Sequence, residues 1–172
     1  AAIYWCARML EGGEDPLYIC RRLIRMATED IGVADTNALT VALNAYQTYT
    51  ILGSPEGELA ILEAVIYLTA APKSNSVYTA YNSVKEFIAK DGYRPVPLHI
   101  CNAPTKLMKD LGYSKNYKYP FNYKYNYVAE KYFPDEIAEQ EFYNPSNFGF
   151  EKEIKKRIEF WLNLKSNNPD KK

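Results

Sequence analysis

Apolar side chains recur at helical spacing through the first 90 residues, and glycine or proline interrupts them at intervals. One stripe consists of Leu17, Cys20, Ile24, Ala27 and Ile31, every three or four residues, as on one face of a helix. Such stripes predict five helices, bounded by glycine, proline and capping side chains. We expect them at about residues 1–11, 16–31, 36–52, 55–71 and 75–90. The predicted caps are Asp15, Asp35 or Thr36, and Ser74 or Asn75.

The third and fourth predicted helices carry very little charge. No residue from Thr36 to Pro55 is charged, and Leu59–Ala71 contains only Glu63. A helix that is apolar nearly all round cannot face water. Such faces are buried within the fold or covered by a second subunit, and two adjacent helices of this kind favour an oligomer. The candidate interface residues are Leu59, Leu62, Ala64, Val65, Ile66, Tyr46 and Tyr49.

The pattern changes after Gly92. The run YRPVPLHICNAPT is predicted to be extended, because each proline disfavours helical backbone at the residue before it. A short helix is expected from Asn102 or Ala103 to about Leu111, and FPDE at 133–136 is expected to begin a helical turn. Between them, seven tyrosines occur from Tyr113 to Tyr132 without a helical period.

A last amphipathic helix is predicted in FEKEIKKRIEFWLNLK, followed by a frayed tail, SNNPDKK, at 166–172. The apolar face of that helix consists of Phe150, Ile154, Ile158, Trp161 and Leu162. The predicted fold class is therefore all-α. We expect a helical bundle at 1–92, which would be the oligomerisation core. Residues 93–172 would form a proline-flanked joint, a short helix, an irregular tyrosine-rich extension and a C-terminal helix packed on the bundle.

Composition narrows the setting. Lysine plus arginine equals aspartate plus glutamate, 21 each, so net charge indicates no polyanionic partner. The three cysteines show no C-x-x-C spacing, which favours buried thiols in a reducing cytoplasm. The uncharged stretch is too polar for a bilayer span, and no signal peptide is recognised. We expect a soluble cytoplasmic protein with no membrane partner. The apolar start AAIYWCARML, without methionine, is interpreted as a fragment of a longer chain.

Lysines and tyrosines alternate in segment 106–132, as at single-stranded nucleic acid sites, where ammonium groups meet phosphates and rings stack on bases. The candidate DNA-binding residues are Lys106, Lys109, Lys115, Lys118, Lys124, Tyr117, Tyr119 and Tyr123. The other interpretation is that the tyrosines bury their rings and strap the segment over the bundle. The acidic run at 135–141 favours that second interpretation.

Catalytic motifs are not found in this sequence. It contains no G-x-x-x-x-G-K-[ST] loop for nucleotide phosphates and no G-x-S-x-G. His99 and Cys101 are conceivable as a nucleophile pair, but no third orienting group accompanies them. The alternative is that His99 hydrogen-bonds to backbone and fixes the joint. We therefore expect no catalytic, cofactor-binding or metal-ligating residues in this chain.

Four stretches together resemble one family in order and spacing. They are ARMLEGGEDPL from Ala7, ATEDIGVAD from Ala27, AAPKSNSVY from Ala70 and VPLHICNAPTKLMKDLGY from Val96. They are similar to the C-terminal region of the replication-associated recombination protein A family. Its members, also called RarA or MgsA, are AAA+ ATPases similar to the eukaryotic Werner-helicase-interacting protein.

This resemblance implies a helical domain related to clamp-loader collar domains, which assembles the protein as a homotetramer. The ATPase module, with its ATP and magnesium, would lie outside this chain. The whole bacterial protein would maintain stalled replication forks and act in recombination and DNA repair. Its partners would be DNA and single-strand-binding protein, and it would associate with the nucleoid when at forks.

The tyrosine-rich segment departs from the family pattern. Ser114 and Asn116 stand where the family usually has glycines flanking a lysine. After YKYP the chain continues with Phe121-Asn122, where the family often has His-Asp. A fixed chemical role for this segment is therefore not implied by the resemblance.

Overall fold

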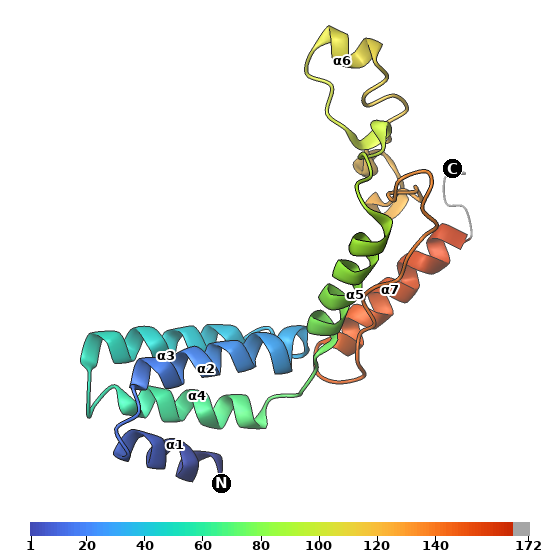
Figure 1. The fold of residues 1–172 in the computed structure, drawn as a ribbon. Helices are drawn as coiled ribbons and strands as arrows, with labels where there is room; N and C mark the ends of the chain where they lie inside the picture. The colour runs from blue at the N-terminus through green and yellow to red at the C-terminus, as the bar shows by residue number, and fades with distance from the viewer. Residues whose placement is uncertain (167–172) are drawn as a thin grey trace. The chain divides into compact units, whose positions relative to one another are not determined.

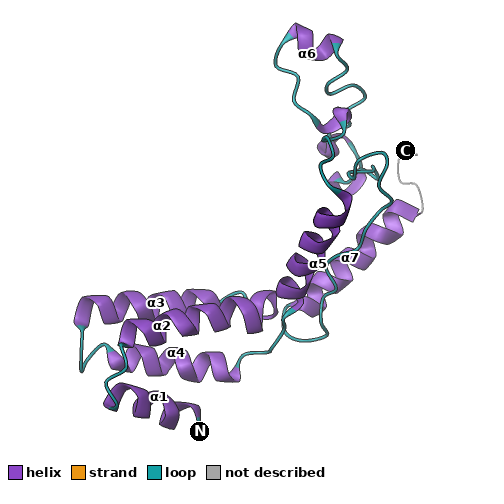
Figure 2. Cartoon of the chain, viewed as in Figure 1, coloured by secondary structure: helices purple, strands orange, loops and turns teal. Residues whose placement is uncertain are grey.

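The computed structural model describes residues 1–166, which form helices, turns and loops without a strand (Figure 2). The predicted all-α class is confirmed. The chain divides into two compact units. The first unit comprises 1–82 and 143–155, and the second comprises 83–142 and the chain from 156 onward. The bundle was expected at 1–92. The first unit instead ends at residue 82 and also includes residues 143–155.

The first unit contains four complete helices, the short helical turns Ala27–Ile31 and Gly32–Ala34, and the N-terminal parts of α5 and α7. The helices are α1 (Ala2–Glu11), α2 (Pro16–Met26), α3 (Ala38–Leu52), α4 (Glu58–Ala70), α5 (Ser76–Asp91) and α7 (Glu151–Ser166). Helices α2, α3 and α4 pack against one another, and α1 packs against α4 (Figure 1).

Small residues line the contact between α3 and α4. Ala38, Ala42 and Ala45 on α3 and Ala64 on α4 are buried, together with larger residues such as Leu68. Because alanine adds only a methyl group, the two helix axes can approach closely. This explains why two nearly uncharged helices can pair within a single chain.

Local hydrogen bonds shift some predicted boundaries. Asp15 caps α2 as predicted, since its Oδ1 accepts the Leu17 N–H at 2.9 Å. Asp35 instead accepts the N–H of Asn37, which forms a turn, and α3 begins only at Ala38. The predicted start at 36 was therefore wrong by about two residues. The predicted helix through Ile31 also changes, because Ala27–Ile31 forms a wider π-helical turn.

Helix α4 also begins later than predicted, at Glu58, because a turn precedes it in which the Gly57 N–H donates to the Gly53 carbonyl at 2.7 Å. Helix α6 (Lys106–Asp110) begins after Thr105, not at Asn102 or Ala103. The hydroxyl oxygen of Thr105 accepts the Met108 N–H at 3.3 Å and so caps the helix.

Gly149 lets the returning segment lie directly against the bundle. Its φ is +50°, and a Cβ built there would lie 2.0 Å from the Ala34 carbonyl oxygen. The next residue, Phe150, donates its N–H to that same oxygen at 2.7 Å. Only glycine therefore permits this backbone-to-backbone contact within the first unit.

The second unit has little apolar core. Among its described residues Val128 is the single buried hydrophobic side chain. Ring contacts connect the tyrosine-rich segment to α7: Tyr127 stacks on Trp161 with centroids 4.8 Å apart, and Tyr125 meets Phe160 edge-on at 5.5 Å. Aromatic pairs thus hold this unit together more than buried aliphatic side chains do.

The joint was predicted to be extended, but the structure shows that part of it is not. Leu98–Ile100 forms a 3₁₀ turn, and Ser114 closes the loop by donating its N–H to Leu98 and its hydroxyl to the Cys101 carbonyl, at 2.9 and 2.6 Å. Asp135 and Glu136 form an isolated turn after Pro134. Ser166 still belongs to α7, and the rest of the predicted frayed tail, 167–172, lies outside the described residues.

Candidate interaction surfaces

The outer face of α4 presents part of the expected oligomer interface. Leu59 is 72% exposed and Ile66 is 54% exposed, with Glu63 between them on the same helix face. On α3, Leu39 and Leu43 are also exposed. These four apolar side chains are available to another chain.

Other members of the predicted interface are covered within the chain. Ala64 is fully buried in the bundle core, so a second chain cannot reach it, and Val65 is largely buried on the side of α4 that faces α1 and α2. Leu62, Tyr46 and Tyr49 are partly buried against the same core. Helical periodicity alone could not tell the buried side of α4 from its open side, because apolar residues occupy both.

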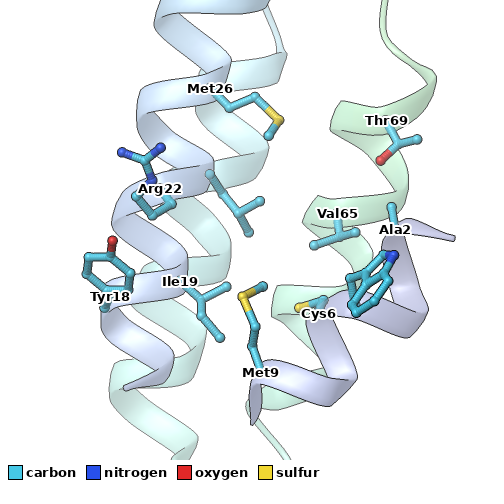
Figure 3. Close-up of a pocket in the computed structure, with 11 residues that line it drawn as sticks. Ala2, Cys6, Met9, Tyr18, Ile19, Arg22, Met26, Val65 and Thr69 are labelled. Atoms are coloured by element: carbon cyan, nitrogen blue, oxygen red, sulfur yellow. The ribbon is translucent and has the colours of Figure 1, made fainter. Parts of the chain in front are cut away.

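A groove between α1, α2 and α4 was not predicted from the sequence. Figure 3 shows side chains from these three helices around an apolar space of about 340 Å³. The lining residues are Ala2, Trp5, Cys6, Met9, Tyr18, Ile19, Arg22, Leu23, Met26, Val65 and Thr69. The sequence does contain apolar residues at helical spacing in α1, namely Ala2, Trp5 and Met9. This spacing cannot reveal a groove, because an ordinary core face has the same spacing.

The candidate DNA-binding lysines lie in the second unit. Lys106, Lys109, Lys115 and Lys124 are exposed, and the last lies over the Tyr125 ring at 5.0 Å. Lys118 differs, because its ammonium lies 3.9 Å from the Glu130 carboxylate. The set is therefore less uniformly available than its spacing suggested.

The tyrosines of this segment have two different environments. Tyr117 and Tyr119 are each 52% exposed, whereas Tyr123 and Tyr127 are partly buried. Tyr125 and Tyr127 contact rings of α7 within the second unit, whereas the strap was expected to lie over the bundle. Tyr117 and Tyr119 thus keep open ring faces, and DNA binding by this segment stays a prediction.

A buried carboxylate joins the returning segment to the bundle in the first unit. Glu151 has no exposed surface. Its Oε1 accepts hydrogen bonds from the hydroxyls of Ser76 and Tyr143, the latter at 2.7 Å, and its Oε2 accepts the Ser146 N–H at 2.9 Å. Every oxygen of this carboxylate is therefore paired, which burial of a charge requires.

These contacts determine the ionisation of the cluster. Burial by itself would raise the pKa of Glu151, but the hydrogen bonds that it accepts outweigh burial and lower its pKa to about 2. Burial, and then the bond to this carboxylate, raise the pKa of Tyr143 to about 12. At neutral pH the cluster is thus one buried anion held by neutral donors, which is a structural arrangement.

The lone histidine does not form the contact expected of it. No hydrogen bond from the His99 side chain is seen within residues 1–166, so the expectation that it fixes the joint was wrong. Cys101 and Ser114 do this instead, with Cys101 Sγ donating to the Pro97 carbonyl at 3.4 Å. In the described part of the chain, no three His, Cys, Asp or Glu side chains gather where they could hold a metal ion.

The features above define a class: an all-helical domain whose notable surfaces are apolar faces and a basic aromatic segment. Within residues 1–166, no helix is both long enough and apolar enough to traverse a lipid bilayer. Comparison with known proteins agrees with this class. The family model described as "MgsA AAA+ ATPase C terminal" matches residues 1–162, and the chain belongs to this family.

Curated relatives are similar along nearly the whole chain. The Replication-associated recombination protein A of Coxiella burnetii is 46% identical and is matched by 95% of this chain. The protein of the same name from Escherichia coli K12 is 45% identical and is matched by 100% of it. ATPase WRNIP1 of Dictyostelium discoideum is 46% identical over 83% of this chain. The chain spans only 38%, 39% and 16% of these relatives, respectively.

Proposed function

We propose that this chain is the oligomerisation domain of an AAA+ ATPase and assembles as a homotetramer. The observation that supports this is the apolar outer face of α4, where Leu59 and Ile66 are more than half exposed on a helix with little charge. Burying apolar area contributes roughly 25 cal/mol per Å², so a neighbouring chain is a favourable cover. The number four rests on the family resemblance alone.

The test is the mass of the chain in solution by light scattering after size exclusion. Replacing Ile66 with glutamate puts a charge on the proposed interface and should lower the mass. Ile88→Glu is the matched control, because Ile88 is similarly exposed, at 57%, but lies in the second unit. Ala64→Glu would be uninformative, since Ala64 is buried and the variant would unfold the bundle. A monodisperse monomer at high concentration would refute the proposal.

The longer protein is proposed to hydrolyse ATP and to act in replication-fork maintenance and recombination, on DNA and near single-strand-binding protein in the bacterial cytoplasm. The support is the family membership and the names of its relatives. ATP hydrolysis should require the region that this chain does not cover. ATP hydrolysis that copurifies with this chain, in the absence of the rest of the protein, would contradict that division of roles.

A second candidate function is weak binding of single-stranded DNA by the second unit. Four exposed lysines and the exposed rings of Tyr117 and Tyr119, all within residues 106–124, favour it. If it is correct, replacing Lys109, Lys115 and Lys124 with alanine should flatten the salt dependence of binding, by about 0.7 in slope for each lost phosphate contact.

The control for this experiment replaces three lysines elsewhere, Lys90, Lys152 and Lys156, which are also exposed. It should leave the slope unchanged. Undetectable binding by the unaltered chain at low salt would eliminate this second function, as would equal slopes for the two triple variants.

A further inference from the structure

The groove between α1, α2 and α4 differs from other hollows of the first unit, such as those beside Asp30, in its mainly apolar lining. It is a surface groove of about 340 Å³ between apolar side chains, and apolar surface left in water favours being covered. Large apolar side chains surround it: Trp5 is 60% exposed, Met9 45% and Tyr18 43%. In Figure 3, Met9, Ile19 and Val65 point toward this space from three different helices. Nothing in the described chain fills it.

We propose that this groove is occupied by the polypeptide that directly precedes Ala1 in the full-length protein. The family to which the chain belongs is defined as the C-terminal part of an AAA+ ATPase, and the chain spans only 38% of its Coxiella relative. A long N-terminal region therefore belongs to such proteins, and it joins this domain through α1.

The position of α1 makes this occupant favourable. Ala2 and Trp5, in the first turn of α1, themselves line the groove. Residues immediately before Ala1 thus start at its edge and are held there by a covalent link. Such tethering gives an effective concentration in the millimolar range, which a separate molecule would have to match in free solution.

The lining determines what the occupant must offer. Arg22 is the single charged side chain around the groove, and the other lining residues are apolar or weakly polar. The occupying segment should therefore place bulky apolar side chains inside and an acidic residue near Arg22. A helix or turn with this pattern would dock the preceding module against α1, α2 and α4.

Cysteine labelling tests the proposal. Tyr18→Cys places a thiol at the groove, and Thr36→Cys places one on an exposed loop as the control. Both are made with Cys101→Ser, in this chain and in the full-length protein. Burial raises the pKa of Cys6, and of Cys20 to about 11, so these two thiols stay protonated and react slowly with maleimide.

The proposal requires that Tyr18→Cys react at least about tenfold more slowly in the full-length protein than in this chain, at every protein concentration. Thr36→Cys should react equally in both. Adding Met9→Glu, which puts a charge into the groove, should restore fast labelling in the full-length protein. This chain carrying Met9→Glu should keep its melting temperature, because Met9 is 45% exposed.

Two results would overturn the proposal. Equal labelling of Tyr18→Cys in both proteins would show that the groove stays open in the full-length protein. If labelling of Tyr18→Cys is slow in this chain without the rest of the protein, and slows further as the chain concentration rises, a second copy occupies the groove. In that second case the chain assembles, but through the groove and not through the outer face of α4. If the proposed tetramer itself failed, the chain would instead stay monomeric in light scattering.

Discussion

The two units of this chain are stabilised in different ways. Of the buried hydrophobic residues found in 1–166, all but Val128 lie in the first unit. There, alanines allow α3 and α4 to approach, and leucine and isoleucine fill the space between helices. In the second unit, partly exposed rings pack in pairs, such as Tyr127 with Trp161. The comparison indicates that the bundle carries most of the stability, while the second unit is less protected from local opening.

The largest expected effect comes from Gly149, where the returning segment contacts the bundle. In Gly149→Ala the new Cβ would lie 2.0 Å from the Ala34 carbonyl oxygen, so that backbone must move. We expect a loss of about 4 kcal/mol, in the exceptional range for single substitutions. Thermal unfolding and hydrogen exchange at the Phe150 amide would measure it.

Gly13→Ala is the matched control for this substitution. Gly13 also has a positive φ, +82°, but no atom lies within 4 Å of the position of its Cβ. It should show only the cost of backbone strain, about 1 kcal/mol. Equal losses in the two variants would mean that the contact with Ala34 contributes nothing.

The next effect concerns Glu151, which fastens the same segment through hydrogen bonds. Because its pKa is about 2 when folded and its ordinary value is 4.5, its contribution is fully present above about pH 4.5. That contribution is lost as the pH falls toward 2. Glu151→Gln should cost about 3 kcal/mol at pH 7, since an amide cannot accept from all three donors.

The pH dependence gives this prediction its control. Between pH 4.5 and 2, Glu151→Gln should lose less stability than the unaltered chain, because the titrating group has been removed. Glu159→Gln, at an exposed position on the same helix, should leave both the stability and the acid slope unchanged. An acid slope in Glu151→Gln equal to that of the unaltered chain would contradict the low pKa.

A smaller effect is expected from the ring pair of the second unit. A double-mutant cycle with Tyr127→Leu and Trp161→Leu should give a coupling energy of about 1 kcal/mol. The same variants should accelerate amide exchange near Val128 and leave exchange at Ile61 in the bundle unchanged. Acceleration at both sites would show that the two units unfold together, which would remove the distinction between them.

The sequence predicted the bundle far better than its surfaces. Stripes such as Leu17, Cys20 and Ile24 locate a helix, because one side of it must be apolar wherever it packs. The same periodicity cannot show which apolar residues remain open. Ala64 was assigned to an interface and is core, while Trp5 and Met9, to which the sequence analysis assigned no role, line an open groove.

Contacts between distant residues were out of reach for a different reason. Glu151 occurs in a charged helix, and no local pattern distinguishes it from its exposed neighbour Lys152. Its burial depends on Ser76, 75 residues earlier, and on a chain reversal at Gly149. The ring pairs of the second unit likewise join Tyr127 to Trp161 without any period that would reveal the pairing.

The smallest expected effects separate Ser114 and His99, two residues at the joint. Ser114→Ala removes the hydroxyl that donates to the Cys101 carbonyl at 2.6 Å and should cost about 1 kcal/mol. His99→Ala removes a partly exposed ring whose side chain makes no hydrogen bond seen within residues 1–166, and should stay within about 0.5 kcal/mol. Chemical denaturation, followed by the fluorescence of Trp161 in a Trp5→Phe background, reports on the second unit. A larger loss for His99→Ala than for Ser114→Ala would restore the histidine to the fixing role that the structure gives to Ser114 and Cys101.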